Sequence, residues 1–181
     1  MSRLPNTPSQ TAGPFFSLGL TWEGAENLVN PGDTGAIVVE GLVLDGAGQP
    51  VPDAVLEIWQ ADEEGRFPPD CRPNWPGFGR SITDVEGAFR FVTVKPGQVA
   101  ASDGTLQAPH LEVQIFARGL LRQLATRIYF PDEREANLTD PALCAVPDAQ
   151  ARKTLVAQAT RTGLRFDVVL QGEDETVFFG L

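Results

Sequence analysis

Glycine and proline recur along the whole chain and divide it into short apolar stretches. There are 18 glycines and 15 prolines among 181 residues, and they punctuate the sequence without forming a low-complexity tract. Both residue types favour turns, so they leave little room for long helices. Within the stretches 89–92 and 165–168, polar and apolar residues alternate, as a half-buried strand requires. This pattern predicts many short strands joined by turns.

The predicted strands are too short to bury both of their faces alone, so two packed sheets are expected. We therefore predict a mostly β chain, a single-domain β-sandwich with long N-terminal and inter-strand loops and one short helix. The helix is expected over 149–159, where Asp148 can cap a run of good helix formers. Tight hairpin turns are expected at 45–48 and 84–87. The predicted strands are 36–45, 54–60, 88–94, 111–117, 124–130 and 164–170.

Two regions are long and irregular in this interpretation. Residues 1–35 form an N-terminal arm, and 61–80 form a proline-rich loop within the sandwich of 36–181. No internal repeat or linker divides the chain further. Loops of this length in a compact domain usually bind a ligand or a partner.

The charge balance excludes some partners. With 14 basic and 24 acidic residues, the net charge of −10 argues against nucleic acid and against an anionic membrane surface. No apolar run approaches the roughly 20 residues of a membrane span, and residues 1–5 contain no apolar signal core. Cys71 and Cys144 lie far apart and are expected to be free thiols. A cytoplasmic location is therefore predicted.

Several motifs resemble the intradiol ring-cleavage dioxygenases, which are non-haem iron(III) enzymes that open catechols between the two hydroxyl-bearing carbons. The most specific motif begins at Val39-Glu40-Gly41-Leu42-Val43 and leads through Leu56-Glu57-Ile58 to Gly65-Arg66-Phe67. Together the matching stretches cover nearly the whole chain. The further stretches are 7–15, 79–84, 93–97 and 171–179.

The resemblance also shows what this chain lacks. Catalytic members hold iron with two tyrosines and a His-x-His pair, whose imidazoles converge because residues i and i+2 of a strand share a face. Here His110, the only histidine, is followed by Glu112 at the second histidine position. Gln98 and Val99 stand where one tyrosine is expected, and 61–77 contain none. Three of the four ligands are therefore absent.

The resemblance implies an iron-free α subunit that works with a homologous β subunit, whose tyrosines and histidines hold iron(III). The implied reaction cleaves protocatechuate, a small aromatic catechol acid, with O₂ to 3-carboxy-cis,cis-muconate. An arginine would suit the substrate carboxylate, and Phe15 would lie beside its ring. The substrate-channel residues that the resemblance implies are Thr11, Gly13, Pro14, Phe15 and Arg127.

Other interpretations stay open at this point. Arg127 can instead form a surface or inter-chain salt bridge, and 11–14 can be a simple packing turn. Glu57 is either a solvated strand residue or, as we expect, a structural ion-pair partner. Tyr129 is expected to lie in the core or an interface. Whole-protein alternatives are a non-catalytic β-sandwich binding or structural protein derived from the same fold, and a self-sufficient enzyme using His110 and Glu112 with another metal.

Overall fold

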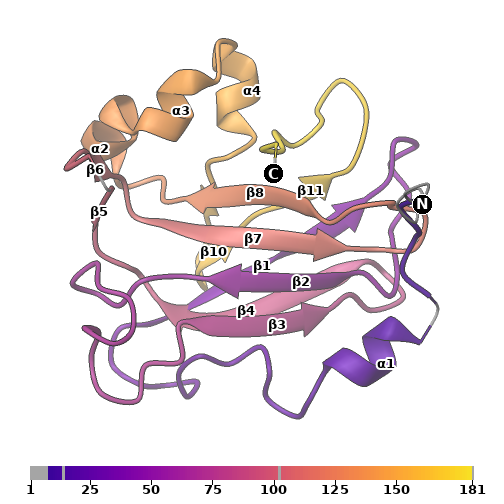
Figure 1. Ribbon diagram of the computed structural model, residues 1–181, viewed down its shortest axis with the longest axis horizontal. Helices are drawn as coiled ribbons and strands as arrows, with labels where there is room; N and C mark the ends of the chain where they lie inside the picture. Colours follow the sequence, from indigo (N-terminus) through magenta and orange to yellow (C-terminus); the bar gives the residue numbers. More distant parts are fainter. Residues whose placement is uncertain (1–7, 14, 102, 181) are drawn as a thin grey trace, which may run out of the picture.

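Two open β-sheets face each other and form the body of the chain (Figure 1). The computed structural model describes residues 8–13, 15–101 and 103–180. The first sheet is fully antiparallel, in the order β3-β2-β7-β8. Its strands are β2 (Val55–Trp59), β3 (Phe78–Ile82), β7 (His110–Phe116) and β8 (Leu124–Tyr129).

The second sheet is built around the long strand β1. On one edge β1 pairs antiparallel with β4, and on the other it pairs in parallel with β10 and β11. A separate two-stranded ribbon joins β5 to β6. The bounds are β1 (Ala36–Leu44), β4 (Ala88–Val94), β5 (Val99–Ala100), β6 (Leu106–Gln107), β9 (Gln158–Ala159), β10 (Leu164–Arg165) and β11 (Val168–Val169).

The core lies between the two sheets. Alternate residues of each strand point inward and are buried, which is the outcome expected of a period-two pattern. This arrangement confirms the predicted mostly β sandwich. The largest contributors from the two sheets are Val39, Val43, Phe89, Phe91, Leu56, Ile58, Leu111, Ile115 and Ile128.

Five of the six predicted strands are present with bounds within one residue. The sixth, predicted over 164–170, is interrupted between β10 and β11. There the side chain of Asp167 accepts a hydrogen bond from the Leu42 amide at 2.9 Å, so a side chain replaces a strand carbonyl. Strand β3 was not predicted, because its first residues fall inside the proline-rich segment 61–80.

The part of the chain that the structure describes forms four short helices, where one was predicted. They are α1 (Phe16–Leu20), α2 (Arg134–Thr139), α3 (Pro141–Ala145) and α4 (Ala149–Lys153). Asp148 caps α4 as expected, by accepting from the Gln150 amide at 2.8 Å. The helix ends early because the following residues pair with β8: Tyr129 donates to the Leu155 carbonyl, and Ala157 donates to the Tyr129 carbonyl.

The helices lie on opposite sides of the sandwich (Figure 1). Helices α2, α3 and α4 lie above β8, toward its arrowhead, and α1 lies below β3. None of the helices within 8–13, 15–101 and 103–180 is long and apolar enough to cross a membrane.

Both predicted tight turns are present. Gly48 donates to the Asp45 carbonyl and Gly87 to the Asp84 carbonyl, each at 3.0 Å, and both glycines have positive φ. The second turn does not close a hairpin within one sheet, however. It leads from β3 in the first sheet to β4 in the second, and so it ties the two layers together.

Gly41 on β1 lies directly against the backbone of the segment that joins β10 to β11. A Cβ atom at this position would lie 1.7 Å from the Phe166 carbonyl oxygen, which is backbone and cannot turn away. We therefore expect Gly41→Ala to lower the free energy of unfolding by about 3 kcal/mol. Denaturant unfolding measures this loss. Gly19→Ala is the matched control, since no atom lies within 4 Å of the added methyl group; equal losses in both variants would contradict the assignment.

Candidate functional site

His110 and Glu112 project from the same outer face of β7. Across the sheet, Tyr129 on β8 is in register with His110, and Arg127 is in register with Glu112. The His110 ring is buried, with Nδ1 2.7 Å from the Ala108 carbonyl oxygen and Nε2 3.4 Å from Glu112 Oε1. Both ring nitrogens therefore face groups of this chain.

Arg127 is the centre of this cluster. Its Nη2 lies 2.6 Å from Glu112 Oε1, while Nη1 donates to Gln107 at 2.8 Å and to the Tyr129 hydroxyl at 3.3 Å. The guanidinium also lies 5.9 Å from the ring centre of Phe179. Only 18% of the side chain is exposed. Arg127 thus bridges the two strands and keeps its positive charge, as its raised pKa shows: burial opposes that charge, but Tyr129 and Glu112 outweigh the effect.

The Tyr129 hydroxyl is held in place by Asp140, and both residues are fully buried. Tyr129 donates to Asp140 Oδ1 at 2.9 Å, and the same oxygen accepts from two backbone amides at the start of α3. The other oxygen accepts from the Ala108 amide at 2.9 Å. Burial raises the pKa of Tyr129 well above its ordinary value, so the hydroxyl stays protonated.

This cluster does not fit an iron(III) ion. The positive guanidinium of Arg127 already pairs with Glu112, and a second cation there would be repelled. Tyr129 is a hydrogen-bond donor to Asp140, whereas a tyrosine ligand must be a phenolate. In the described ranges, no three His, Cys, Asp or Glu side chains come together in a way that could hold a metal.

Glu112 is expected to make acid stability depend on this cluster. Burial would raise its pKa, but the His110 hydrogen bond and the Arg127 charge hold that pKa below its ordinary value of 4.5. A carboxylate with a lowered pKa stabilises the fold above its unfolded pKa, and the contribution disappears as the pH falls through the folded value.

Glu112→Gln should therefore lose stability less steeply than the wild type when the pH falls below 4.5. Thermal unfolding measured across this range tests the expectation. Glu86→Gln, in an exposed turn, is the control and should keep the wild-type slope. If the stability of Glu112→Gln fell with pH as steeply as that of the wild type, the Glu112–Arg127 pair would not contribute to acid stability.

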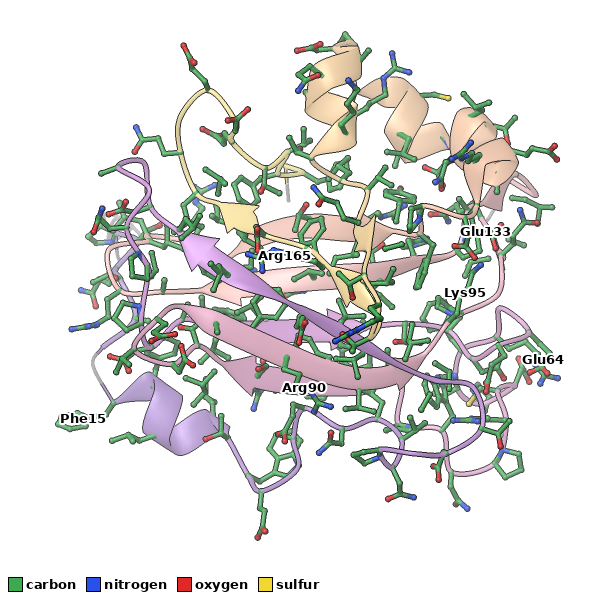
Figure 2. The ribbon with its side chains drawn as sticks, turned by 180° about the vertical axis from the view of Figure 1, so that it is seen from behind. Phe15, Glu64, Arg90, Lys95, Glu133 and Arg165 are labelled. Carbon is green, nitrogen blue, oxygen red and sulfur yellow. The ribbon has the colours of Figure 1, made fainter. Side chains whose placement is uncertain are left out.

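The N-terminal arm reaches a different part of the same sheet. Thr11 accepts a hydrogen bond from the Gly119 amide at 2.7 Å, in the loop between β7 and β8. Gly13 accepts from the Phe16 amide at 3.2 Å as the chain turns into α1. The Phe15 side chain is 75% exposed and points away from the body (Figure 2). Pro14 lies outside the described residues.

The described residues do not gather the predicted substrate residues into one pocket. The arm lies at the loop end of the β7–β8 hairpin, while Arg127 is near its open end, beside Tyr129. A hollow of about 220 Å³ beside the arm is lined by Gln10, Ala12 and residues of the β7–β8 loop, and not by Arg127.

Sequence reasoning missed two members of the cluster. Gln107 comes from β6 and Asp140 from the α2–α3 junction, so neither is near Arg127 in sequence. Asp140-Pro141 could have been read as a helix start, since Asp is a favoured cap and proline suits the first helical position. Its bond to Tyr129 had no sequence signal.

An aromatic surface continues from the cluster across the four-stranded sheet. Trp59 is in register with Glu112, and the Phe78 ring lies 4.8 Å from Trp59 and 6.3 Å from Trp22. Trp22 and Trp59 are 52% and 46% exposed. Beside them Arg80 donates to Glu57 at 2.9 Å, which confirms the predicted ion-pair role of Glu57. Exposed aromatic side chains gathered on one face are typical of a protein interface.

Comparison with known proteins agrees with this fold. A sequence profile described as "Dioxygenase" matches residues 13–172. The protocatechuate 3,4-dioxygenase alpha chain of Pseudomonas putida is 41% identical over 194 residues, covering 97% of this chain and 96% of that one. This chain belongs to the intradiol dioxygenase family. Its predicted resemblance to that family is thereby confirmed.

Two further relatives, an alpha chain and a beta chain, allow the two kinds of chain in the family to be compared with this one. The Burkholderia cepacia protocatechuate 3,4-dioxygenase alpha chain is 42% identical, with 99% of each chain covered. The beta chain from the same organism is 35% identical, covering 77% of this chain and 66% of that one. The alpha chains thus match over more of their length.

Solved structures of the family share the fold. The dioxygenase domain of a dioxygenase–carbohydrate-binding fusion from Streptomyces sp. SirexAA-E has a TM-score of 0.59 at 24% identity, covering 92% of this chain and 99% of that one. Acinetobacter radioresistens catechol 1,2-dioxygenase has a TM-score of 0.63 at 18% identity, covering 82% of this chain and 57% of that one. At these identities the likeness concerns the fold alone.

Proposed function

We propose that this chain is the α subunit of a protocatechuate 3,4-dioxygenase, which cleaves protocatechuate with O₂ to 3-carboxy-cis,cis-muconate during aromatic degradation. The observation that carries the proposal is the near-full-length similarity to two chains of that name. The Arg127–Glu112 pair supports an α chain that leaves iron binding to its partner. Glu112 stands where a catalytic chain of this family has a metal-binding histidine, and here it pairs with Arg127.

The iron(III) would be held by the tyrosines and histidines of a homologous β chain. A beta chain of the same enzyme in Burkholderia cepacia is itself related to this chain, which fits two subunits built on one fold. The self-sufficient alternative with another metal is disfavoured, since Arg127 and His110 already engage Glu112.

In the assembled enzyme this chain would contribute part of the substrate channel. Phe15 is exposed and free to lie beside an aromatic ring. Arg127, which already pairs with Glu112, would attract the substrate carboxylate and offer it charge-assisted hydrogen bonds. Thr11, Gly13 and Pro14 would let the arm approach the substrate closely, with the Thr11 contact anchoring the arm to the β7–β8 loop.

The arm and Arg127 lie apart in this chain, so the β chain would have to supply the part of the substrate channel that joins them. The half-exposed aromatic surface of Trp22, Trp59 and Phe78 would supply part of the contact area. We also propose the cytoplasm as the compartment, since Cys71 and Cys144 are both free thiols.

Size-exclusion chromatography of the co-produced α and β chains tests the partnership. A single peak containing both chains at micromolar concentration is expected, and it should persist on dilution as obligate interfaces do. Two separate peaks would favour the alternative of a non-catalytic sandwich protein. Trp59→Ser on the aromatic surface should weaken the complex, whereas Val85→Ser, at an exposed turn, should not.

A further inference from the structure

A groove of about 430 Å³ lies among the helices α2, α3 and α4. Its walls are mainly apolar, and its size falls in the range of small-molecule sites. Leu138 is 77% exposed at its edge, while Leu143 is buried and also packs with Tyr129 in a second small core. Val156 completes the apolar wall.

The charged residues that line this groove, among those that the structure describes, are all basic. Arg134, Arg152 and Lys153 line it, and no acidic residue does. In a chain with a net charge of −10, this is a local reversal of the overall charge. A cavity lined by a single sign of charge concentrates ligands of the opposite sign, in this case anions.

Two buried polar atoms on the groove walls have no hydrogen-bond partner. They are Arg152 Nε and Asn137 Oδ1, and only one other such side-chain atom, on Asn27, is found in the described part of the chain. One other nitrogen of each side chain is engaged: Asn137 Nδ2 donates to the Phe130 carbonyl at 2.9 Å, and Arg152 Nη2 to the Pro147 carbonyl at 3.4 Å.

The unpaired donor on Arg152 and the unpaired acceptor on Asn137 indicate which groups a ligand would need. Arg152 needs an acceptor and is cationic, which suits a carboxylate. Asn137 Oδ1 needs a donor, which suits a hydroxyl group. Both side chains line the groove and are only partly buried. The apolar wall between them suits a flat ring.

We propose that this groove binds a small aromatic hydroxy acid. The ring would lie against Leu138, Leu143 and Val156, and the carboxylate would meet Arg152 with Arg134 and Lys153 nearby. The hydroxyl group would donate to Asn137 Oδ1. This site lies beyond the Asp140 cap, away from the β7–β8 loop and the arm, and it does not depend on the proposed function.

Equilibrium dialysis of labelled 4-hydroxybenzoate against this chain alone, and against the co-purified αβ assembly, tests this site. Arg152→Met should weaken binding at one class of sites about 10-fold or more, as expected for loss of a charge-assisted contact. Arg152→Lys should retain part of the affinity, and Arg134→Met, at an exposed position, should cause a smaller loss. Arg161→Met, at an exposed arginine outside the groove, is the matched control and should bind as the wild type does.

Ligand analogues and stability measurements complete the test. Benzyl alcohol, which lacks the carboxylate, should not compete. Arg152→Met removes one long hydrogen bond, from Nη2 to the Pro147 carbonyl at 3.4 Å, so its Tm should fall only slightly. Three results would each overturn the proposal. They are wild-type affinity in both Arg152→Met and Arg134→Met, competition by benzyl alcohol as strong as that by unlabelled 4-hydroxybenzoate, and absence of binding because a partner chain covers the groove.

Discussion

Arg127→Ala in the assembled enzyme is expected to lower kcat/KM for protocatechuate by roughly 10- to 150-fold while leaving the iron content intact. The loss corresponds to about 1.5–3 kcal/mol for a hydrogen-bonded charge. The reason is the loss of the guanidinium that, in the proposed function, would meet the substrate carboxylate. Steady-state ring cleavage at several salt concentrations measures it, and the wild-type rate should fall with salt more steeply than the mutant rate.

The same variant also leaves Glu112 without its main cation, so a structural effect must be separated from a binding effect. The double variant Arg127→Ala/Glu112→Gln removes that uncompensated charge. It should recover stability but not affinity for protocatechuate. Catechol, which lacks the carboxylate, should be affected much less than protocatechuate by Arg127→Ala. Parallel salt dependences with KM unchanged would mean that Arg127 is only an ion-pair residue.

Without its partner, this chain is expected to cleave no protocatechuate. The cluster around Arg127 leaves no place for a metal, and the described residues supply no other metal cluster. Oxygen uptake with the chain alone, with the β chain alone and with the two mixed measures the dependence. Full activity should require the mixture, and a rate from the chain alone equal to that of the mixture would contradict the subunit assignment.

Local patterns carried most of the fold prediction. Strands such as β4 alternate regularly, and the side-chain period is inherent in an extended backbone. The short helices were harder to predict, because five or six residues show too little periodicity, and their ends are fixed by tertiary contacts. The early end of α4 is an example, since pairing of Leu155 and Ala157 with Tyr129 has no local signal.

Only the part of the candidate site that comes from a single strand could be predicted from the sequence. The spacing of His110 and Glu112 predicted a shared face, and that is where they lie. The partners of Arg127 come from β6, β7, β8 and the C-terminal tail, through Gln107, Glu112, Tyr129 and Phe179. Contacts between elements so distant in sequence follow from the packing of the whole sheet, and no single stretch encodes them.

We propose that this chain shares in the enzyme without holding its metal. Metal analysis of the purified αβ assembly tests this most directly, in the wild type and in His110→Gln/Glu112→Gln. One iron for each αβ pair is expected in both proteins, with the same visible absorption band. Two irons for each pair, or loss of iron and colour in the double variant, would contradict it.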